Sequence, residues 1–509
     1  MDSDVEQEAK RRNGLNPEIA TSATTRKIHT AGSFIGGRWS VSRADNVSTN
    51  PAHPSQVVGR YQVSTAEEVD YAVDTARSAW REWCMVNSIE RGRVIRRAAI
   101  LLEKRAEEIA RLITLEEGKT LPEARSEVLR TIETFHYHAG RAWAPTGKTY
   151  ASSMPDEDVR TVRFPVGVVA VISPWNFPVL TPAWKIAPAL VHGNTVVWKP
   201  ASLTPIVAAE LVRILEQAGV PAGVLNLVLG SGRVGQQIVD HPGVDAITFT
   251  GSTQVGQGIW NSATPRGVKV QLELGGHNAA IVFPDADLDH AAKTVVAGAM
   301  LSAGQKCTAT RRIIALSEVH DELAERIRTE AERLVVGDGL IEGVDVSPLV
   351  SRSALEEVKG EIDRACQEGA ELLAGGEVLE GAEYDGGHYL APTVFVVKDP
   401  KIRLCREEVF GPVTAIMEAS DDEEAFELAN ATRFGLCAAV FTASERRTRR
   451  AVAELEAGMI NINTSTTGSE LHVPFGGVKA SSSQAPREQG ETAEEFFTES
   501  KTVYLVPGD

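Results

Sequence analysis

The chain has 509 residues, 43% of them hydrophobic, and its 69 acidic residues outnumber its 52 lysines and arginines, which gives a net charge of −17. This charge, without any cluster of basic residues, argues against a nucleic-acid partner and against an anionic membrane surface. No apolar run approaches the roughly 20 residues of a membrane span, and the acidic first residues lack the apolar segment of a secretory signal.

The cysteines indicate the compartment. They are scattered without paired spacing or neighbouring histidine pairs, and the five of them are Cys84, Cys307, Cys366, Cys405 and Cys437. An odd number in this arrangement suits neither a disulfide framework nor a zinc site. We therefore expect reduced thiols, no bound metal and a cytoplasmic location. The length predicts a globular protein of more than one domain.

The pattern of apolar residues changes along the chain. Residues 1–30 are polar and lack periodic apolar positions, so we expect a flexible N-terminal extension. Between residues 66 and 140, apolar residues recur every three or four positions, which predicts amphipathic helices. From Arg163, short β-branched runs alternate with helix-like segments, which predicts a parallel, doubly wound sheet. A second series of this kind follows Leu274.

The predicted fold class is α/β, with two doubly wound α/β domains. Residues 31–145 and 163–273 would form a first, Rossmann-like domain, and residues 274–490 a second one. The last apolar run, close to the C-terminus, has no partner strand nearby in the sequence, and such a strand often pairs with a distant hairpin or with another subunit. We therefore assign residues 146–162 and 491–509 to a small β element for bridging and oligomerisation.

Two glycine-rich turns compete for one ligand role. Residues 230–235 read G-S-G-R-V-G, which matches the dinucleotide fingerprint G-x-G-x-x-G, and they follow a predicted strand. Residues 249–256 (FTGSTQVG) also link a strand to a helix, so their backbone N–H groups could bind a pyrophosphate at the helix N-terminus. A turn without any ligand would have the same pattern. The turns by themselves leave the choice between them open.

Seven motifs in one order carry a resemblance to a known family. They are SPWNFP (173–178), NTVVWKPAS (194–202), FTGSTQVG (249–256), LELGGHN (272–278), GQKCTAT (304–310), EEVFGPV (407–413) and PFGGVK (474–479). This set, with a match from Phe34 to Leu505, resembles aldehyde dehydrogenases. GQKCTAT, HVPFGGVKASSS (472–483) and REQG (487–490) are similar to the α-ketoglutaric semialdehyde (2,5-dioxopentanoate) dehydrogenases of that family. The resemblance implies that the first domain binds NAD(P) and that the second is the catalytic domain.

The resemblance also implies where the cofactor lies. It places the pyrophosphate at the 249–256 turn and the 230–235 turn nearer the adenosine, with Lys199 at the adenosine ribose, Glu408 at the nicotinamide ribose and Phe410 against the nicotinamide. NAD-specific members usually carry Glu at the position of Ser202, where a carboxylate would repel a 2′-phosphate. Because a serine removes that repulsion and Lys199 is nearby, we predict that NADP is preferred over NAD. The predicted cofactor residues are Ser173, Pro174, Trp175, Lys199, Ser202, Gly232, Gly251, Ser252, Gly256, Leu274, Glu408 and Phe410.

The reaction implied is oxidation of an aldehyde to a carboxylic acid through a thiohemiacetal and a thioester on Cys307. We expect this cysteine to be exposed and, with Lys306 beside it, to favour the thiolate. Asn176 would donate to the oxyanion, and Glu273 would be the general base, with a pKa raised by burial between two leucines. Its carboxylate argues for hydrolysis rather than transfer to coenzyme A. Without their neighbours, the three catalytic candidates would be interpreted as a small buried thiol, a turn asparagine and a strand glutamate.

The family counterparts of six residues line the aldehyde tunnel: Phe177, Trp184, Lys306, Thr308, His472 and Phe475. This partly aromatic set with two potential cations suits a short ω-semialdehyde such as α-ketoglutaric semialdehyde. Several succinic semialdehyde dehydrogenases carry an arginine where Trp184 stands, so succinic semialdehyde and general aliphatic aldehydes stay open, as does a non-catalytic scaffold that holds NAD(P). The terminal β segments resemble the family's bridging strands, which implies a homodimer or homotetramer.

Overall fold

The computed structural model describes residues 28–40, 44–144, 146–483 and 485–507. Most of the predicted N-terminal extension, residues 1–27, lies outside the described residues. Strand β1 (His29–Ala31) begins within the predicted extension and pairs in parallel with β5 (His53–Tyr61), whose other neighbour is β4 (Asn46–Asn50). Ordered structure therefore begins earlier than the sequence predicted, because a strand of three residues is too short to show a periodic pattern.

A sheet of seven strands organises the first domain in the part of the chain that the structure describes. Its order is β12 (Lys269–Glu273), β11 (Ala246–Thr250), β8 (Val168–Ile172), β9 (Thr195–Lys199), β10 (Leu225–Leu227), β2 (Ser33–Ile35) and β3 (Arg38–Ser40). Strands β8 to β12 are parallel, whereas β2 and β3 add an antiparallel edge. The chain moves from β8 to β9 and β10 on one side and then returns to β11 on the other. The direction of winding thus reverses between β8 and β11, which is where open α/β sheets bind their ligands.

Helices cover both faces of this sheet because the side chains of its buried strands alternate between two cores. On β8, Val169 and Val171 pack with one set of helices, whereas Val168, Ala170 and Ile172 pack with the other. The first set is α3 (Ser88–Lys104), α4 (Ala106–Glu117), α5 (Leu121–Arg141), α6 (Leu180–Val191) and α7 (Pro205–Gln217). The second set is α2 (Ala66–Trp83), α8 (Gly232–Asp240) and α9 (Thr253–Ala263).

The second domain is built around its own sheet of seven strands within the described residues. The order is β15 (Glu371–Ala374), β16 (Thr393–Val397), β17 (Val413–Ala419), β14 (Thr310–Leu316), β13 (Asn278–Val282), β19 (Cys437–Phe441) and β20 (Met459–Ile462). The accompanying helices are α10 (Leu288–Met300), α11 (His320–Glu332), α12 (Arg352–Gln367), α13 (Asp422–Asn430) and α14 (Glu445–Glu454). Only β15 is antiparallel to its neighbour. The prediction of two doubly wound α/β domains is confirmed.

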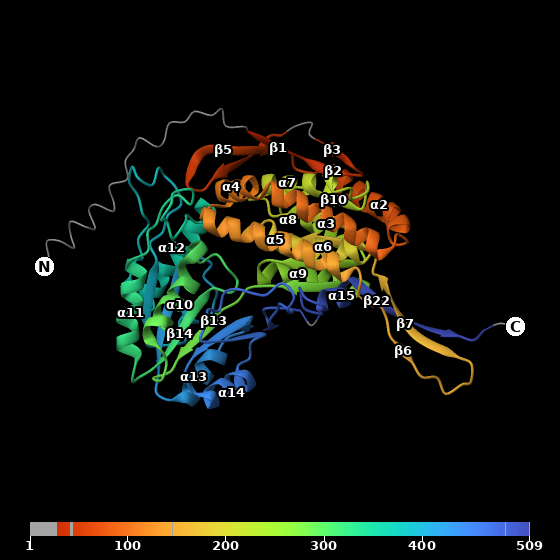
Figure 1. Ribbon diagram of the computed structural model, residues 1–509. Helices are drawn as coiled ribbons and strands as arrows, with labels where there is room; N and C mark the ends of the chain where they lie inside the picture. Colours follow the sequence, from red (N-terminus) through yellow and green to blue (C-terminus); the bar gives the residue numbers. More distant parts are fainter. Residues whose placement is uncertain (1–27, 41–43, 145, 484, 508–509) are drawn as a thin grey trace.

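A β arm projects from the first domain, at the right in Figure 1. It consists of β6 (Thr149–Tyr150), β7 (Asp158–Pro165) and β22 (Thr498–Leu505), and β22 pairs antiparallel with the whole of β7. The last strand thus pairs with a distant hairpin, which is one of the two partners that the sequence left open. The helix before it, α15 (Thr492–Phe497), buries Phe496 and Phe497 in the core of the first domain, so the arm is anchored at its base.

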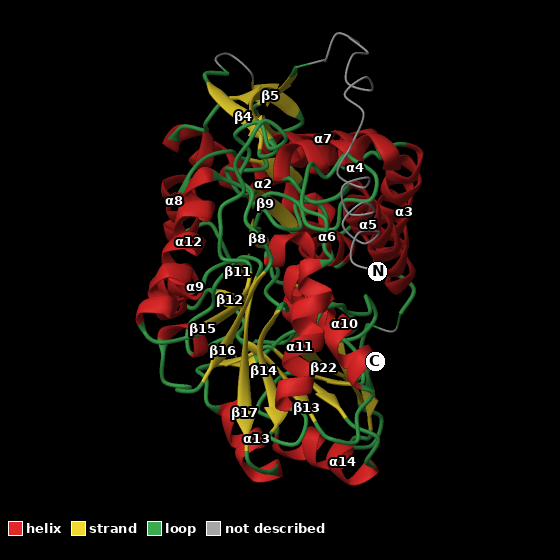
Figure 2. Cartoon of the chain, turned by 90° about the vertical axis from the view of Figure 1, so that its left-hand side faces the viewer, coloured by secondary structure: helices red, strands yellow, loops and turns green. Residues whose placement is uncertain are grey.

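The carboxyl ends of strands in the first domain face the amino ends of strands in the second domain, and Figure 2 shows the first domain above the second. The segments that follow β8, β11 and β12 leave the carboxyl ends of their strands, whereas those that precede β14 and β17 lead into amino ends, and both groups line one cavity. Short pieces far apart in the sequence therefore converge there. In the described part of the chain, no helix has the length and apolar character that crossing a membrane requires.

Candidate active site

The cavity between the two domains encloses about 710 Å³. It contains all three predicted catalytic residues, Cys307, Glu273 and Asn176. Of the predicted cofactor residues, its wall includes Pro174, Trp175, Gly251, Ser252, Leu274, Glu408 and Phe410, and of the predicted substrate residues it includes Phe177, Trp184, Lys306, Thr308 and Phe475. A volume of this size, with a few polar groups among apolar ones, is typical of a ligand site.

His472 does not belong to this wall, so its role as a tunnel residue stays a prediction. Its side chain is exposed, in a turn closed by a hydrogen bond from the Val473 N–H to the Glu470 carbonyl. Phe475, three residues later, is held by backbone pairing with Glu488 and packs its ring 5.3 Å from that of Trp184. The turn separates two residues that share one sequence motif, so only Phe475 faces the cavity.

The nucleophile candidate follows a strained turn. Ser302, Ala303 and Gly304 all have positive φ, at 56°, 51° and 65°. Left-handed backbone costs a residue with a Cβ roughly 1–2 kcal/mol, so surrounding contacts must hold it in place. The Ser302 hydroxyl donates to Glu123 Oε1 at 2.7 Å, and the Arg311 guanidinium donates to the Gly304 carbonyl. These contacts fix the path of the chain into Cys307.

The backbone of Cys307 is held from the other side by Asn278. Its Nδ2 donates to the carbonyl oxygens of Cys307 and Ala309, both at 2.8 Å, and its Oδ1 accepts from the Cys437 N–H. Gly276 makes this approach possible, since a Cβ there would lie 2.3 Å from the Cys307 oxygen. Asn278 and Gly276 stand in the motif LELGGHN, but nothing in the linear sequence showed that they position the nucleophile.

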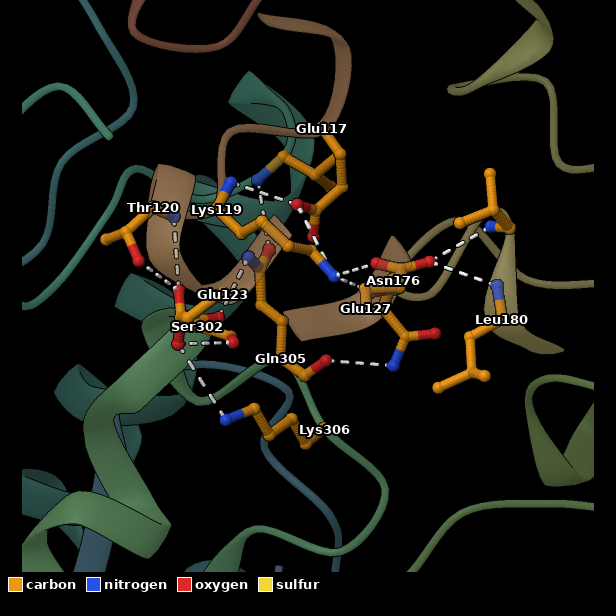
Figure 3. A network of polar contacts seen from close by, with 12 residues as sticks. Glu117, Lys119, Thr120, Glu123, Glu127, Asn176, Leu180, Ser302, Gln305 and Lys306 are labelled. Atoms are coloured by element: carbon orange, nitrogen blue, oxygen red, sulfur yellow. Dashed lines mark hydrogen bonds and ion pairs between the residues drawn. The ribbon is translucent and has the colours of Figure 1, made fainter. Parts of the chain in front are cut away.

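The surroundings of the Cys307 thiol do not activate it. Although the residue is partly exposed, burial raises the pKa of its thiol, and the nearby carboxylates Glu408 and Glu273 raise it further. Lys306 points away to Glu123, with 3.9 Å between Nζ and Oε1 (Figure 3). Exposure and Lys306 therefore do not favour a thiolate in this arrangement, and the thiol proton has to pass to a base.

Asn176 lies beside the nucleophile loop. Its Nδ2 donates to the Gln305 carbonyl at 2.9 Å, which directs the amide toward the segment that carries Cys307 (Figure 3). The second N–H of that amide and the backbone N–H of Cys307 are then the donors available to a reacting oxygen in the cavity. Two such donors are what an oxyanion hole requires.

A buried ion pair holds Asn176 in this position. Lys119 Nζ donates to the Asn176 carbonyl at 2.6 Å and to Glu127 Oε2 at 2.7 Å, while Glu127 Oε1 accepts from the N–H groups of Val179 and Leu180 at 3.0 and 3.2 Å (Figure 3). Lys119 and Glu127 are almost fully buried. Sequence reasoning missed this pair, although one signal existed: Glu127 lies on the apolar stripe of its helix, where a charge needs a partner.

Glu273 ends strand β12 with its side chain in the cavity. Burial raises its pKa well above the ordinary value for a glutamate, and the charge of Glu488 raises it further. The Ser482 hydroxyl donates to Glu273 Oε1 at 2.9 Å, and Oε2 has no partner within the described residues. Glu488, in turn, is paired with the buried Lys185. A carboxyl with one occupied and one unoccupied oxygen, and an elevated pKa, takes up a proton more readily than an ordinary glutamate does.

The opposite end of the cavity is suited to a dinucleotide. Helix α9 begins there, directly after β11 and at the point where the winding of the sheet reverses, and the N–H groups of Thr253 and Gln254 have no intrahelical acceptor. Gly256 brings this helix close to the following strand, since a Cβ there would lie 2.4 Å from Leu274 Cδ2. The turn at Gly251 contributes its shape rather than a donor, because its N–H is bound to the Glu273 carbonyl.

Charged groups at this end of the cavity and beside it also fit a cofactor. Lys199 is buried without an acceptor for its ammonium among the described residues, and burial lowers its pKa to about 8. Burial raises the pKa of Glu408 to about 7, and its Oε1 accepts from the Gly276 N–H. Phe410 meets Trp175 edge to face at 5.6 Å, which leaves an aromatic wall in the cavity. A buried ammonium and a buried carboxylate, both incompletely paired, suit a ligand with ribose hydroxyls and phosphates.

The remaining cofactor candidates lie outside the cavity wall. Lys199 is the last residue of β9, and Ser202 and Gly232 follow the carboxyl ends of β9 and β10 on the same edge of the sheet. A Cβ on Gly232 would meet nothing within 4 Å. The Ser173 hydroxyl is already occupied, since it accepts from the Trp198 indole at 2.9 Å. The edge therefore continues from the cavity toward Ser202, along the line that an extended dinucleotide would follow.

Comparison with known proteins agrees with this geometry. Residues 39–503 match the Aldehyde dehydrogenase family. The chain is 46% identical to an alpha-ketoglutaric semialdehyde dehydrogenase of Bacillus subtilis (strain 168), over 93% of this chain and 98% of that protein, and 45% identical to an alpha-ketoglutarate semialdehyde dehydrogenase of Haloferax volcanii, over 92% and 98%.

Among solved structures, the betaine aldehyde dehydrogenase of Staphylococcus aureus in complex with NAD+ superimposes with a TM-score of 0.91 at 32% identity, covering 94% of this chain and 95% of that one. Family match, sequence identity and fold agree over nearly the whole described chain. The chain therefore belongs to the aldehyde dehydrogenase family, and the prediction of an NAD(P)-dependent aldehyde dehydrogenase is confirmed.

Proposed function

We propose that this enzyme oxidises α-ketoglutaric semialdehyde, or a short ω-semialdehyde of the same kind, to the free carboxylic acid. The observation that carries the proposal is the convergence of Cys307, Asn176 and Glu273 in one cavity whose other end fits a dinucleotide. The names of the two relatives at 46% and 45% identity support the substrate class. Glu273 supports hydrolysis over transfer to coenzyme A, since it is a base in the same cavity as the nucleophile.

The first step joins Cys307 to the substrate. The thiol sulfur attacks the aldehyde carbon, a carbon–sulfur bond forms, and the carbonyl electron pair moves to the oxygen. The oxyanion receives hydrogen bonds from the Asn176 side chain and the Cys307 N–H, while the thiol proton passes to Glu273. A carboxylate with a raised pKa is a better proton acceptor than an ordinary one, which favours this transfer although the pKa of the thiol is raised as well.

The second step releases the acid. The oxidised nicotinamide, when bound, supplies the acceptor for the hydride that leaves the thiohemiacetal. The thioester on Cys307 is then attacked by a water molecule whose proton passes to Glu273, which has returned its first proton to solvent. The carbon–sulfur bond breaks, Cys307 leaves as thiolate, and the product is a free carboxylic acid. The same two donors, from Asn176 and Cys307, stabilise the oxyanion in both steps.

The cofactor preference is part of the proposal. Ser202 stands on the cofactor edge without a negative charge, and the Lys199 ammonium lies nearby without an acceptor among the described residues. These features favour NADP, because a 2′-phosphate meets a cation rather than a carboxylate. We expect kcat/KM to be higher with NADP than with NAD, and Ser202→Glu to reverse that order. A wild-type preference for NAD would contradict this part.

We also propose a homodimer or homotetramer in the cytoplasm. The outer edge of β22 has no strand beside it in the described chain, and Tyr504, Leu505 and Val506 on the same arm are exposed. An unpaired strand edge with exposed apolar side chains at its end is suited to pairing with a second copy. The five cysteines are free thiols, which suits a reducing compartment. Light scattering should give a multiple of the 54.8 kDa chain mass, whereas a monomer would contradict the assignment.

Steady-state kinetics test the substrate class directly. Purified enzyme with NADP is offered α-ketoglutaric semialdehyde, succinic semialdehyde and pentanal, and the absorbance of the reduced cofactor is followed. We expect the highest kcat/KM for α-ketoglutaric semialdehyde. A preference for pentanal would contradict the acidic substrate. Tight NADP binding without turnover of any aldehyde would instead favour a non-catalytic scaffold.

A further inference from the structure

The end of the cavity that is enclosed by α5, α6 and residues 469–475, called the aldehyde end below, contains one cation without a carboxylate partner. The described wall has four cationic side chains, and three of them form ion pairs: Lys119 with Glu127 at 2.7 Å, Lys306 with Glu123 at 3.9 Å and Arg403 with Glu361 at 2.9 Å. Arg130 is the fourth. Among the described residues, its guanidinium meets only a neutral group, the Ser469 hydroxyl, to which Nη2 donates at 3.3 Å.

The other arginines near the nucleophile are not available to a ligand. Arg311 donates to the Gly411 carbonyl at 2.6 Å, and Arg312 donates to the His277 carbonyl at 3.0 Å. Both are fully buried and neither lines the cavity. Their guanidinium groups satisfy backbone carbonyls of the catalytic domain. Trp184 contributes an apolar wall at its position, so a negative charge on the substrate has no partner there.

The location of Arg130 is the end of the cavity remote from the cofactor edge. It lies on α5 one turn after Glu127, whose carboxylate holds the first residues of α6. Its contact, Ser469, belongs to the segment that leads to Phe475, and Phe475 packs against Trp184 on α6. Helices α5 and α6 and this segment therefore enclose one space, and Arg130 stands in its wall.

We propose that Arg130 binds the carboxylate of the substrate and thereby selects aldehydes with an acidic end. This proposal rests on the proposed function. A guanidinium has five N–H donors in a planar fork that matches both oxygens of a carboxylate, and only one of these donors is directed to Ser469. The Ser469 hydroxyl accepts from Arg130 and so retains its own hydrogen for the same carboxylate.

The charges around Arg130 add selectivity. Several glutamates also line the cavity, and the two nearest along the helix, Glu123 and Glu127, are both paired with lysines. An anionic substrate therefore meets carboxylates that are already neutralised by their lysine partners, and it is attracted at the unpaired cation. A neutral aldehyde gains nothing from this cation. The attraction thus distinguishes between substrates, which makes Arg130 a specificity residue rather than a general part of the catalytic machinery.

The test compares two substrates in matched variants. Arg130→Met removes the charge and keeps most of the apolar stem, Arg130→Lys keeps the charge without the fork, and Arg125→Met is the control, because Arg125 is exposed on the same helix and paired with Glu107. The substrates are α-ketoglutaric semialdehyde and pentanal, an uncharged aldehyde of equal chain length. For the semialdehyde we expect kcat/KM to fall roughly ten- to hundredfold in Arg130→Met, mostly through KM, and less in Arg130→Lys.

Pentanal decides between recognition and structure. If Arg130 recognises the carboxylate, kcat/KM for pentanal stays unchanged in Arg130→Met, and the control keeps both values. An equal loss for both substrates would show a structural role and overturn the proposal, as would an unchanged preference for the semialdehyde. A wild-type enzyme that does not prefer the semialdehyde over pentanal would contradict the proposed function itself. This outcome is seen in the wild-type measurement, before any variant is made.

Discussion

The two ends of the cavity are built in different ways. The cofactor end consists of short segments that directly follow β8, β11 and β12 or precede β17, so each contributing residue lies close to its own strand in the sequence. The aldehyde end is assembled from side chains of α5 that reach distant partners: Lys119 binds the Asn176 carbonyl, and Arg130 binds Ser469. The residues of the cofactor end can therefore be recognised as sequence motifs. The contacts of the aldehyde end depend on tertiary packing, and its residues position Asn176 and select the substrate without reacting themselves.

The strongest expected effect lies between the two ends, at the nucleophile. Cys307→Ala removes the only atom that can form the thioester, so we expect kcat to fall by at least about 10⁴-fold. Binding of NADP, measured by calorimetric titration, should remain, because the cofactor edge belongs to the other sheet. Cys366→Ala is the control, since that thiol is exposed on α12, and it should keep full activity. Substantial turnover in Cys307→Ala would remove this residue from the mechanism.

The general base should show a different failure. In Glu273→Gln, the thiol proton can still pass to solvent through water, so a slower acylation releases one equivalent of reduced cofactor, but the thioester has no base to activate water. We expect a burst of reduced cofactor in rapid-mixing experiments and then a steady rate lower by about 10²-fold or more. Glu418→Gln, at an exposed position of β17, should behave as wild type. Normal steady turnover without a burst would show that another group activates the water.

The positioning pair at the aldehyde end should give an intermediate effect. Glu127→Gln keeps an acceptor for the N–H groups of Val179 and Leu180 but weakens the bond to Lys119, and Glu127→Leu removes both. We expect kcat to fall about tenfold in the first variant and further in the second, since the loop with Asn176 loses its support. The KM for NADP should not change, because the cofactor edge does not contact this pair.

Thermal unfolding and a control variant separate a positioning role of Glu127 from a loss of folding. Breaking a buried pair costs roughly 3–5 kcal/mol of stability, so thermal unfolding has to show that each variant is folded at the assay temperature. Glu133→Gln, at an exposed position of the same helix, should match wild type in both stability and kcat. If folded Glu127→Leu retains wild-type kcat, Glu127 does not position the oxyanion hole.

What the sequence can predict follows the same division between local and distant contacts. The alternation of strands and helices in both domains follows from apolar runs and their spacing, and Cys307, Asn176 and Glu273 follow from motifs of a few residues. The exposure of His472, the direction of Lys306 and the raised pKa of Cys307 depend on which distant groups lie nearby, and the sequence predicted none of these three features. No linear pattern contains the distance from Lys119 to Asn176.

The smallest expected effect concerns the pH dependence, and it separates two causes of one pKa shift. Burial is the larger reason for the raised pKa of Glu273, and the negative charge of Glu488 is the next. Glu488→Gln removes only the second cause. It also leaves Lys185 without its carboxylate partner, so more positive charge acts on Glu273. Both changes favour the ionised form and lower its pKa, although burial keeps it above the ordinary value.

A base works only when it is ionised, so the activity of the enzyme should fall on the acid side as Glu273 takes up its proton. In Glu488→Gln that acid limb should move to lower pH in a profile of kcat, while the maximum rate changes little. The opposite movement, toward higher pH, would mean that Glu488 stabilises the ionised form through contacts other than its charge. If the acid limb does not move, burial alone raises the pKa of Glu273. The residues of the aldehyde end would then influence Glu273 only by excluding water.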